Sequence, residues 1–156
     1  MRNGYASACW SRHGRKRGSV VLVGAPGVPG FTSPAPGEVV VVDLNSKFGF
    51  DDEPILITNP HPMQTAKFGA SLAWLGEQLL VGTDGSNAGG TDATVYLYGV
   101  GKGNSKLRHQ FTHPTAGGSF NGSVTTLGRH VVRGVPQSDE LGQDAGILFY
   151  FEGQEL

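Results

Sequence analysis

A repeat of 52 residues constrains this chain more than any other feature. When the sequence is shifted by 52 residues, residues 61–98 align with residues 113–150 without a gap. Twelve of these 38 aligned positions are identical, whereas chance gives about 2–3 identities over such a length. The identical pairs include His61/His113, Phe68/Phe120, Ser71/Ser123, Gly82/Gly134, Asp92/Asp144 and Tyr98/Tyr150. Self-similarity at a fixed period indicates a repeat architecture.

A third, looser copy precedes these two. "YASACW" from Tyr5 resembles "FGASLAW" from Phe68, and "VVLVGAPG" from Val20 resembles "QLLVGTDG" and "HVVRGVPQ". "GEVVVVDL" from Gly37 resembles "ATVYLYGV" and "AGILFYFE". We therefore expect three repeats, at about residues 1–44, 55–100 and 107–152.

Each copy contains four short segments with the composition of β-strands. In the second copy they are "ILIT" (55–58), "SLAWL" (71–75), "QLLVG" (78–82) and "TVYLY" (94–98), with turn-forming residues between them. Glycine accounts for 25 of the 156 residues, about twice its ~7% share in an average protein. Such enrichment is typical of a fold with many tight turns. These features predict an all-β fold of about three four-stranded antiparallel blades of a β-propeller. Each blade gains stability by stacking its apolar faces on its neighbours.

Three short motifs carry a resemblance to a known family. Phe68-Gly69 stands before an apolar strand in the second copy, Gly24-Ala25-Pro26 ends an apolar strand in the first copy, and the final apolar strands lie at 37–42 and 94–98. Placed in the order of one repeat, these motifs resemble the FG-GAP repeats of integrin α-subunit propellers and of the C-terminal region of glycosylphosphatidylinositol-specific phospholipase D. The positions that mark the repeat are Gly24, Ala25, Pro26, Phe68, Gly69, Gly82, Phe120 and Gly134. The pattern departs from the family where Asn121 follows Phe120 and where Thr83 and Val135 replace Ala25.

The resemblance implies a seven-bladed propeller, of which residues 1–156 form a part. It further implies a non-catalytic binding scaffold within a larger extracellular or cell-surface protein, with a protein or glycan ligand or further blades as partners. The loops at 26–36 and 84–92 are expected to present the binding surface. The alternative is the propeller fragment of a glycosylphosphatidylinositol-specific phospholipase D-like hydrolase whose catalytic domain lies upstream. In either case we expect no catalytic residues and no hydrolase activity in this chain alone.

Calcium is not expected as a cofactor. Many FG-GAP blades hold Ca²⁺ in an acidic loop, because this cation needs several converging oxygens. The corresponding segments here, "LGEQLL" and "LGRHVV", are short and contain at most one carboxylate. The residues Asp43, Asn45, Asp51 and Asp52 have suitable side chains, but their spacing and their place after a strand favour a solvated loop over a metal site.

Other polar residues are interpreted as structural. The basic run from Arg12 to Arg17 is a candidate anion-binding segment, although a solvated hairpin extension is favoured. His109 and His113 lie four residues apart, but His113 has an equivalent in His61, which favours a structural role. Residues for which packing or turn formation is the expected role are Cys9, Ser71, Ser123, Asp92 and Asp144.

Charge and hydropathy exclude some partners and locations. The formal net charge is −1, so no bulk attraction to nucleic acid is expected. No apolar run approaches the ~18 residues of a membrane span, and the first residues lack the apolar core of a signal peptide. The extracellular or cell-surface location therefore rests on the family resemblance, and Asn121, in Asn121-Gly122-Ser123, is the candidate glycosylation site.

Overall fold

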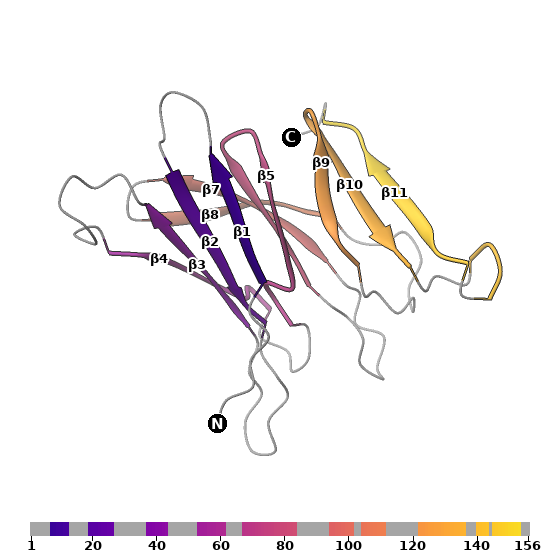
Figure 1. Cartoon of the computed structure of the whole chain (residues 1–156), viewed down its shortest axis with the longest axis horizontal. Coiled ribbons are helices and arrows are strands. Elements are labelled where there is room, and N and C mark those ends of the chain that lie inside the picture. The colour runs from indigo at the N-terminus through magenta and orange to yellow at the C-terminus, as the bar shows by residue number, and fades with distance from the viewer. Residues whose placement is uncertain are drawn as a thin grey trace, which may run out of the picture.

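The computed structural model describes residues 7–12, 19–26, 37–43, 53–61, 67–83, 94–101, 104–111, 122–136, 140–143 and 145–153. Throughout these residues the regular structure consists of β-strands, which form three antiparallel sheets. The all-β prediction is thus confirmed. Figure 1 shows the three sheets side by side, with β4 and β11 toward opposite sides of the molecule.

The first sheet has four strands in the order of the chain. They are β1 (Ser7–Arg12), β2 (Ser19–Ala25), β3 (Glu38–Asp43) and β4 (Ile55–Thr58). Runs of β-branched valine in β2 and β3 suit this structure, because such side chains pack well on a pleated surface.

The second sheet repeats this arrangement with β5 (Ser71–Leu75), β6 (Gln78–Gly82), β7 (Val95–Gly101) and β8 (Asn104–Phe111). The third sheet contains β9 (Val124–Leu127), β10 (His130–Val135) and β11 (Ile147–Phe151), again paired in chain order. Two-residue turns join β5 to β6 and β9 to β10. Gly76 and Gly128 begin these turns with φ of 59° and 62°, in the left-handed region that favours glycine.

The sheets correct the expected grouping of strands. The segment 55–58 was expected to open the second repeat, but as β4 it pairs with β3 of the first sheet. In the same way, 107–111 belongs to β8 of the second sheet rather than to the third repeat. The period of the repeat is unchanged, but each sheet ends one strand later than expected.

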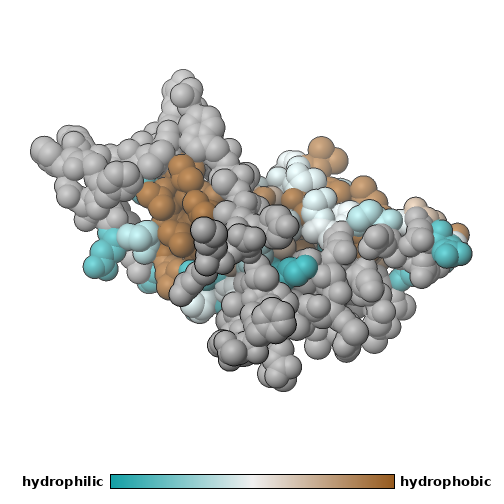
Figure 2. Space-filling view, turned by 60° about the horizontal axis from the view of Figure 1, so that its bottom comes forward, coloured by the Kyte–Doolittle hydropathy of each residue, from teal (hydrophilic) through white to brown (hydrophobic). Residues whose placement is uncertain are grey.

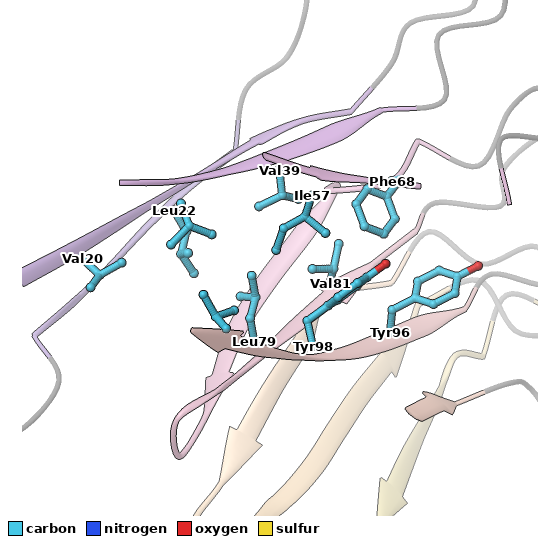
Figure 3. Close-up of a cluster of buried hydrophobic side chains, with 11 residues drawn as sticks. Val20, Leu22, Val39, Ile57, Phe68, Leu79, Val81, Tyr96 and Tyr98 are labelled. Atoms are coloured by element: carbon cyan, nitrogen blue, oxygen red, sulfur yellow. The ribbon is translucent and has the colours of Figure 1, made fainter. Parts of the chain in front are cut away.

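Side chains from neighbouring sheets form separate apolar clusters at the seams between the sheets. We call the face that a sheet turns toward the next sheet along the chain its forward face, and the opposite one its backward face. The forward face of the first sheet packs on the backward face of the second, as Figure 3 shows for Leu22, Val39 and Ile57 above Leu79 and Val81. The full set of buried residues in this seam is Val20, Leu22, Val39, Val41, Ile57, Phe68, Leu79, Val81, Tyr96, Tyr98 and Val100.

The second seam uses the same arrangement. The forward face of the second sheet contacts the backward face of the third through Ala73, Leu75, Leu80, Val95, Leu97, Phe111, Val124 and Val131. Strand β5 contacts β1 and β2 on one side and β9 on the other, and β4 contacts β8. The second sheet therefore has two apolar faces, each covered by a neighbouring sheet.

The register of β11 departs from the ungapped sequence alignment by one residue. Leu79 pairs with Tyr98 in the second sheet, whereas Val131, 52 residues after Leu79, pairs with Phe151. Tyr98 therefore corresponds to Phe151 rather than to Tyr150. A shift of one residue moves a side chain to the other face of a sheet, and Tyr98 is 5% exposed while Tyr150 is 48% exposed.

The two outermost faces are mainly apolar. The backward face of the first sheet carries Val21, Val23, Val40, Val42 and Leu56, with the exposed Glu38 at the end of β3. The forward face of the third sheet carries Thr125, Leu127, His130, Val132, Leu148 and Tyr150. Figure 2 shows hydrophobic surface in the part of the molecule that holds the first sheet, on the left, and in the part that holds the third, on the right.

Candidate functional site

The Phe-Gly motif lies at the seam between the first and second sheets. Phe68 is fully buried, and its ring lies 5.7 Å from that of Tyr96 and 6.2 Å from that of Tyr98, measured between centroids. Gly69 has φ of 91°, and a Cβ there would lie 3.0 Å from the carbonyl oxygen of Glu38 and 3.3 Å from the Cα of Gly24. Phe68 and Gly69 thus meet the strand end that carries Gly24, so two motifs that are 44 residues apart in sequence are neighbours in space.

A serine lies opposite the strand-end glycine in each sheet. Ser7 pairs with Gly24 and Ser71 pairs with Gly82. In the third sheet the amide of Gly134 donates to the carbonyl of Ser123 at 3.0 Å. A Cβ at Gly82 would collide with Oγ of Ser71, so a larger residue here would displace the serine hydroxyl.

Of the remaining motif residues, the structure describes Ala25 and Pro26. Ala25 is exposed at the end of β2 and Pro26 is half-buried. Phe120 and Asn121 lie outside the described residues. Among the marker positions, the structure brings Gly24, Phe68 and Gly69 into one seam and places Gly82 and Gly134 at equivalent strand ends.

Two buried threonines close the base of the connection between β6 and β7. The Thr83 amide donates to the Thr94 carbonyl at 3.0 Å, and the Thr83 hydroxyl donates to the same oxygen at 3.0 Å. The Thr94 amide in turn donates to Oγ1 of Thr83 at 2.7 Å. The segment 84–93 therefore begins and ends at a fixed neck, although it lies outside the described residues, as does most of 26–36.

This neck lies at the same end of the molecule as the strand end of the first sheet. Gly69, which contacts Gly24 and Glu38, also donates its amide to the carbonyl of Gly82 at 3.1 Å, next to Thr83. The connections that follow β2 and β6 therefore leave from adjacent points. We call this end the loop end.

An open groove lies at the opposite end of the second sheet. It has a volume of about 640 Å³ and is lined by Leu75, Glu77, Gln78, Gly99, Val100, Gly101, Asn104, Lys106 and Arg108. The absence of a side chain at Gly99 makes room for the guanidinium of Arg108, whose Nε lies 2.8 Å from where a Cβ would be. The lining is mainly polar and carries both signs of charge.

The structure places few of the candidate metal ligands. Asp43 is exposed at the end of β3, and Asn45, Asp51 and Asp52 lie outside the described residues. Across the described part of the chain, no group of three or more His, Cys, Asp or Glu side chains is close enough to hold a metal ion.

The histidines have aromatic and polar neighbours. The His109 ring lies 4.7 Å from that of Phe111 in an edge-on arrangement, and His113 lies outside the described residues. His61 donates its amide to Oδ1 of Asn59 at 2.9 Å, and its Nε2 lies 3.3 Å from Nε2 of Gln110. His61 thus connects the end of the first sheet to β8.

The other polar candidates are only partly described. Cys9 and Arg12 belong to β1, and the rest of the basic run, Asp92 and Asp144 lie outside the described residues. The described residues include no helix that could cross a membrane.

Arg133 was not singled out from the sequence. It lies on the backward face of the third sheet and is 3% exposed, and its burial lowers the pKa of the guanidinium to about 10. The equivalent position in the second sheet is the buried Val81. The signal in the sequence was the alternation "HVVRGV", which places Arg133 on the face of Val131 and Val135.

No protein-family model matches the chain, and no curated protein matches it in sequence.

Proposed function

We propose that the chain forms three successive blades of an FG-GAP-type β-propeller and acts as a non-catalytic interaction scaffold in a larger extracellular or cell-surface protein. One observation carries this proposal. Forward and backward faces stack in the same way at both seams, and Phe68-Gly69 of one sheet meets Gly24 of the previous sheet. The motif residues that suggested the family thus lie where one blade would join the next.

The loop end is the proposed binding surface for a protein or glycan ligand. Rigid strands commonly position connecting segments that carry binding residues. The buried pair of Thr83 and Thr94 fixes the base of 84–93, and the contact of Gly69 with Gly24 holds the neighbouring strand ends together. The points at which these two connections leave β2 and β6 are therefore held side by side.

Cell binding tests this proposal. The fluorescently labelled chain is incubated with cultured cells, and bound label is measured by flow cytometry. Replacing 85–92 with a glycine-serine segment of equal length is expected to reduce binding at least about tenfold, because several contact residues are lost together. The control Glu77→Gln, at the opposite end of the second sheet, is expected to bind as the unaltered chain does. Equal binding by the loop replacement would contradict the proposed surface, and treating the cells with protease or glycosidase distinguishes a protein ligand from a glycan.

A second candidate function is the propeller fragment of a phospholipase D-like hydrolase, which the short turns between β5 and β6 and between β9 and β10 favour. Gly76-Glu77 and Gly128-Arg129 leave no room in these two hairpins for an acidic calcium loop. Such turns favour the phospholipase-type propeller over a calcium-binding integrin blade. Incubating the chain with membranes that carry a glycosylphosphatidylinositol-anchored alkaline phosphatase is expected to release no enzyme. Release would show that this chain is itself catalytic.

A further inference from the structure

The groove at the end of the second sheet is bordered by an irregular pair of strands. The pairing of β7 with β8 shifts by one residue between Leu97 and Tyr98, which leaves Arg108 without a partner of its own on β7. Such β-bulges are frequent beside functional sites, because they redirect a side chain. The guanidinium of Arg108 occupies the space over Gly99, with its Nε 2.8 Å from where a Cβ would be.

Two glycines of β7 form part of the groove. Gly99 pairs with Lys106 and Gly101 pairs with Asn104, so the four residues lie on the same face of the sheet. A Cβ at Gly101 would lie 3.4 Å from Oδ1 of Asn104. Glycine inside a strand often marks a place where another group approaches the backbone closely. Here the two glycines let the side chains of Asn104 and Arg108 lie against β7.

The other two sheets have a carboxylate where the second sheet has Gly99. In the first sheet the equivalent residue is Asp43, because each of the two pairs with the residue four positions before the strand-end glycine. In the third sheet it is Glu152, which follows Phe151, the equivalent of Tyr98. The second sheet therefore has two cationic side chains around a position that lacks the acidic side chain of its neighbours.

We propose that this groove binds a small hydroxy acid, whose carboxylate takes the place of the missing acidic side chain beside Lys106 and Arg108. A guanidinium can bind a carboxylate through two parallel hydrogen bonds, and an ammonium group adds a compact positive charge. The side-chain amides of Gln78 and Asn104 also line the groove. Each amide can both donate and accept hydrogen bonds, which suits hydroxyl groups of the same ligand.

The charge and the size of the groove agree with such a ligand. Among its described lining residues, Lys106 and Arg108 are cationic and Glu77 is the carboxylate, so the lining favours an anion. Both cationic side chains are exposed, and a ligand can reach them without any rearrangement of the sheet. The volume of about 640 Å³ lies within the range of roughly 300–1,000 Å³ found for small-molecule sites. A sugar acid such as glucuronate has the required carboxylate and hydroxyl groups.

Nuclear magnetic resonance of the full ¹⁵N-labelled chain tests this inference with glucuronate as the probe. The titration is done at low ionic strength, because salt screens exposed charges. Saturable shifts are expected for the amide signals of Gly99, Gly101, Lys106 and Arg108. Glucose, which lacks the carboxylate, is expected to bind at least about tenfold more weakly, since a hydrogen bond to a charged group contributes that much or more. Inorganic phosphate is also expected to bind more weakly, and equal binding of phosphate would overturn the assignment of a hydroxy acid.

Substitutions in the groove separate a specific site from general attraction. Arg108→Gln is expected to weaken glucuronate binding at least about tenfold. Gly99→Asp is expected to abolish it, because the new carboxylate pairs with the cations as the ligand would. Arg129→Gln is the matched control, since it removes an exposed arginine on the turn between β9 and β10 that does not line the groove, and it should bind glucuronate as the unaltered chain does.

Unchanged binding in Arg108→Gln would overturn the proposal, and so would the absence of saturable shifts in the unaltered chain. The same spectra show whether each variant keeps its fold. The groove lies at the end of the second sheet opposite the loop end, so this inference does not depend on the proposed function. The chain with 85–92 replaced is therefore expected to bind glucuronate normally, whatever its binding to cells.

Discussion

The hydroxyl of Thr126 donates a 3.0 Å hydrogen bond to the main-chain oxygen of Trp74, the residue 52 positions earlier. Equivalent positions of two successive repeats thus contact each other across a seam. Thr126 lies on the backward face of the third sheet, whereas Thr125 lies on its forward face.

Thr126→Val is expected to lower the free energy of unfolding by about 0.5–1.5 kcal/mol, the usual net contribution of one hydrogen bond. The two side chains have nearly the same shape, so packing changes little. Urea denaturation measures the effect. Thr125→Val is the matched control because its side chain is exposed, and an equal loss in both variants would mean that the seam hydrogen bond is not the cause.

Gly82→Ala is expected to destabilise the fold by about 1–3 kcal/mol, as overpacking of a filled site does. The added methyl group collides with Oγ of Ser71. Gly134→Ala is the matched control, because a Cβ there would lie 3.6 Å from Oγ of Ser123, an ordinary contact. Combining Gly82→Ala with Ser71→Gly should recover part of the stability, and a lack of recovery would contradict the steric explanation.

Gly69→Ala is expected to cost more stability than Gly76→Ala, as judged by thermal unfolding. Both glycines have positive φ, so each substitution carries the strain of about 1–2 kcal/mol of a left-handed residue. Only Gly69 also faces close neighbours, at 3.0 Å from Glu38 O, whereas Gly76 has open space. Equal costs would show that the seam adjusts to a methyl group without penalty.

The buried tyrosines Tyr96 and Tyr98 are expected to lower the stability of the fold as the pH rises above 10, whereas the lowered pKa of Arg133 acts in the opposite direction. Burial raises the pKa of Tyr98, and also that of Tyr96, above the ordinary value of 10.0. The unfolded chain therefore loses these protons first, binds fewer protons than the folded chain, and is favoured at alkaline pH.

Tyr98→Phe tests this pH dependence. The variant should show a smaller loss of unfolding free energy between pH 9 and 11, measured by urea denaturation. It should remain as stable as the unaltered protein at pH 7, because the Tyr98 hydroxyl is buried with no hydrogen-bond partner among the described residues. Tyr150→Phe, which changes a half-exposed side chain, is the control. An unchanged alkaline loss in Tyr98→Phe would assign it to other groups.

The sequence was sufficient to predict the strands and their period, because turns and alternating apolar residues recur with the repeat. It could not assign residues 55–58 to a sheet. A periodic sequence has no intrinsic starting point, and only the pairing of Val39 with Ile57 decides the boundary.

The register of β11 was hidden by a coincidence. The identity of Tyr98 with Tyr150 favoured an ungapped alignment. A shift of one residue in the pairing of a strand moves its side chains to the other face of the sheet, so the two tyrosines lie on opposite faces. The burial of Arg133 was not predicted either. Charged residues are rarely buried, and the equivalent residue of the second sheet is the uncharged Val81. Gly24 and Gly69 are close in space because the first two sheets stack, and a local sequence pattern does not predict which sheets stack.

Each of the described strands pairs with strands next to it in the chain, and each of the three sheets ends before the next begins. The polypeptide can therefore fold in the order of its synthesis, since every sheet has all its strands before its neighbour emerges from the ribosome. Contacts between residues close in sequence also speed folding. The second sheet can therefore pack on the apolar face of a first sheet that is already formed, and the third sheet on that of the second.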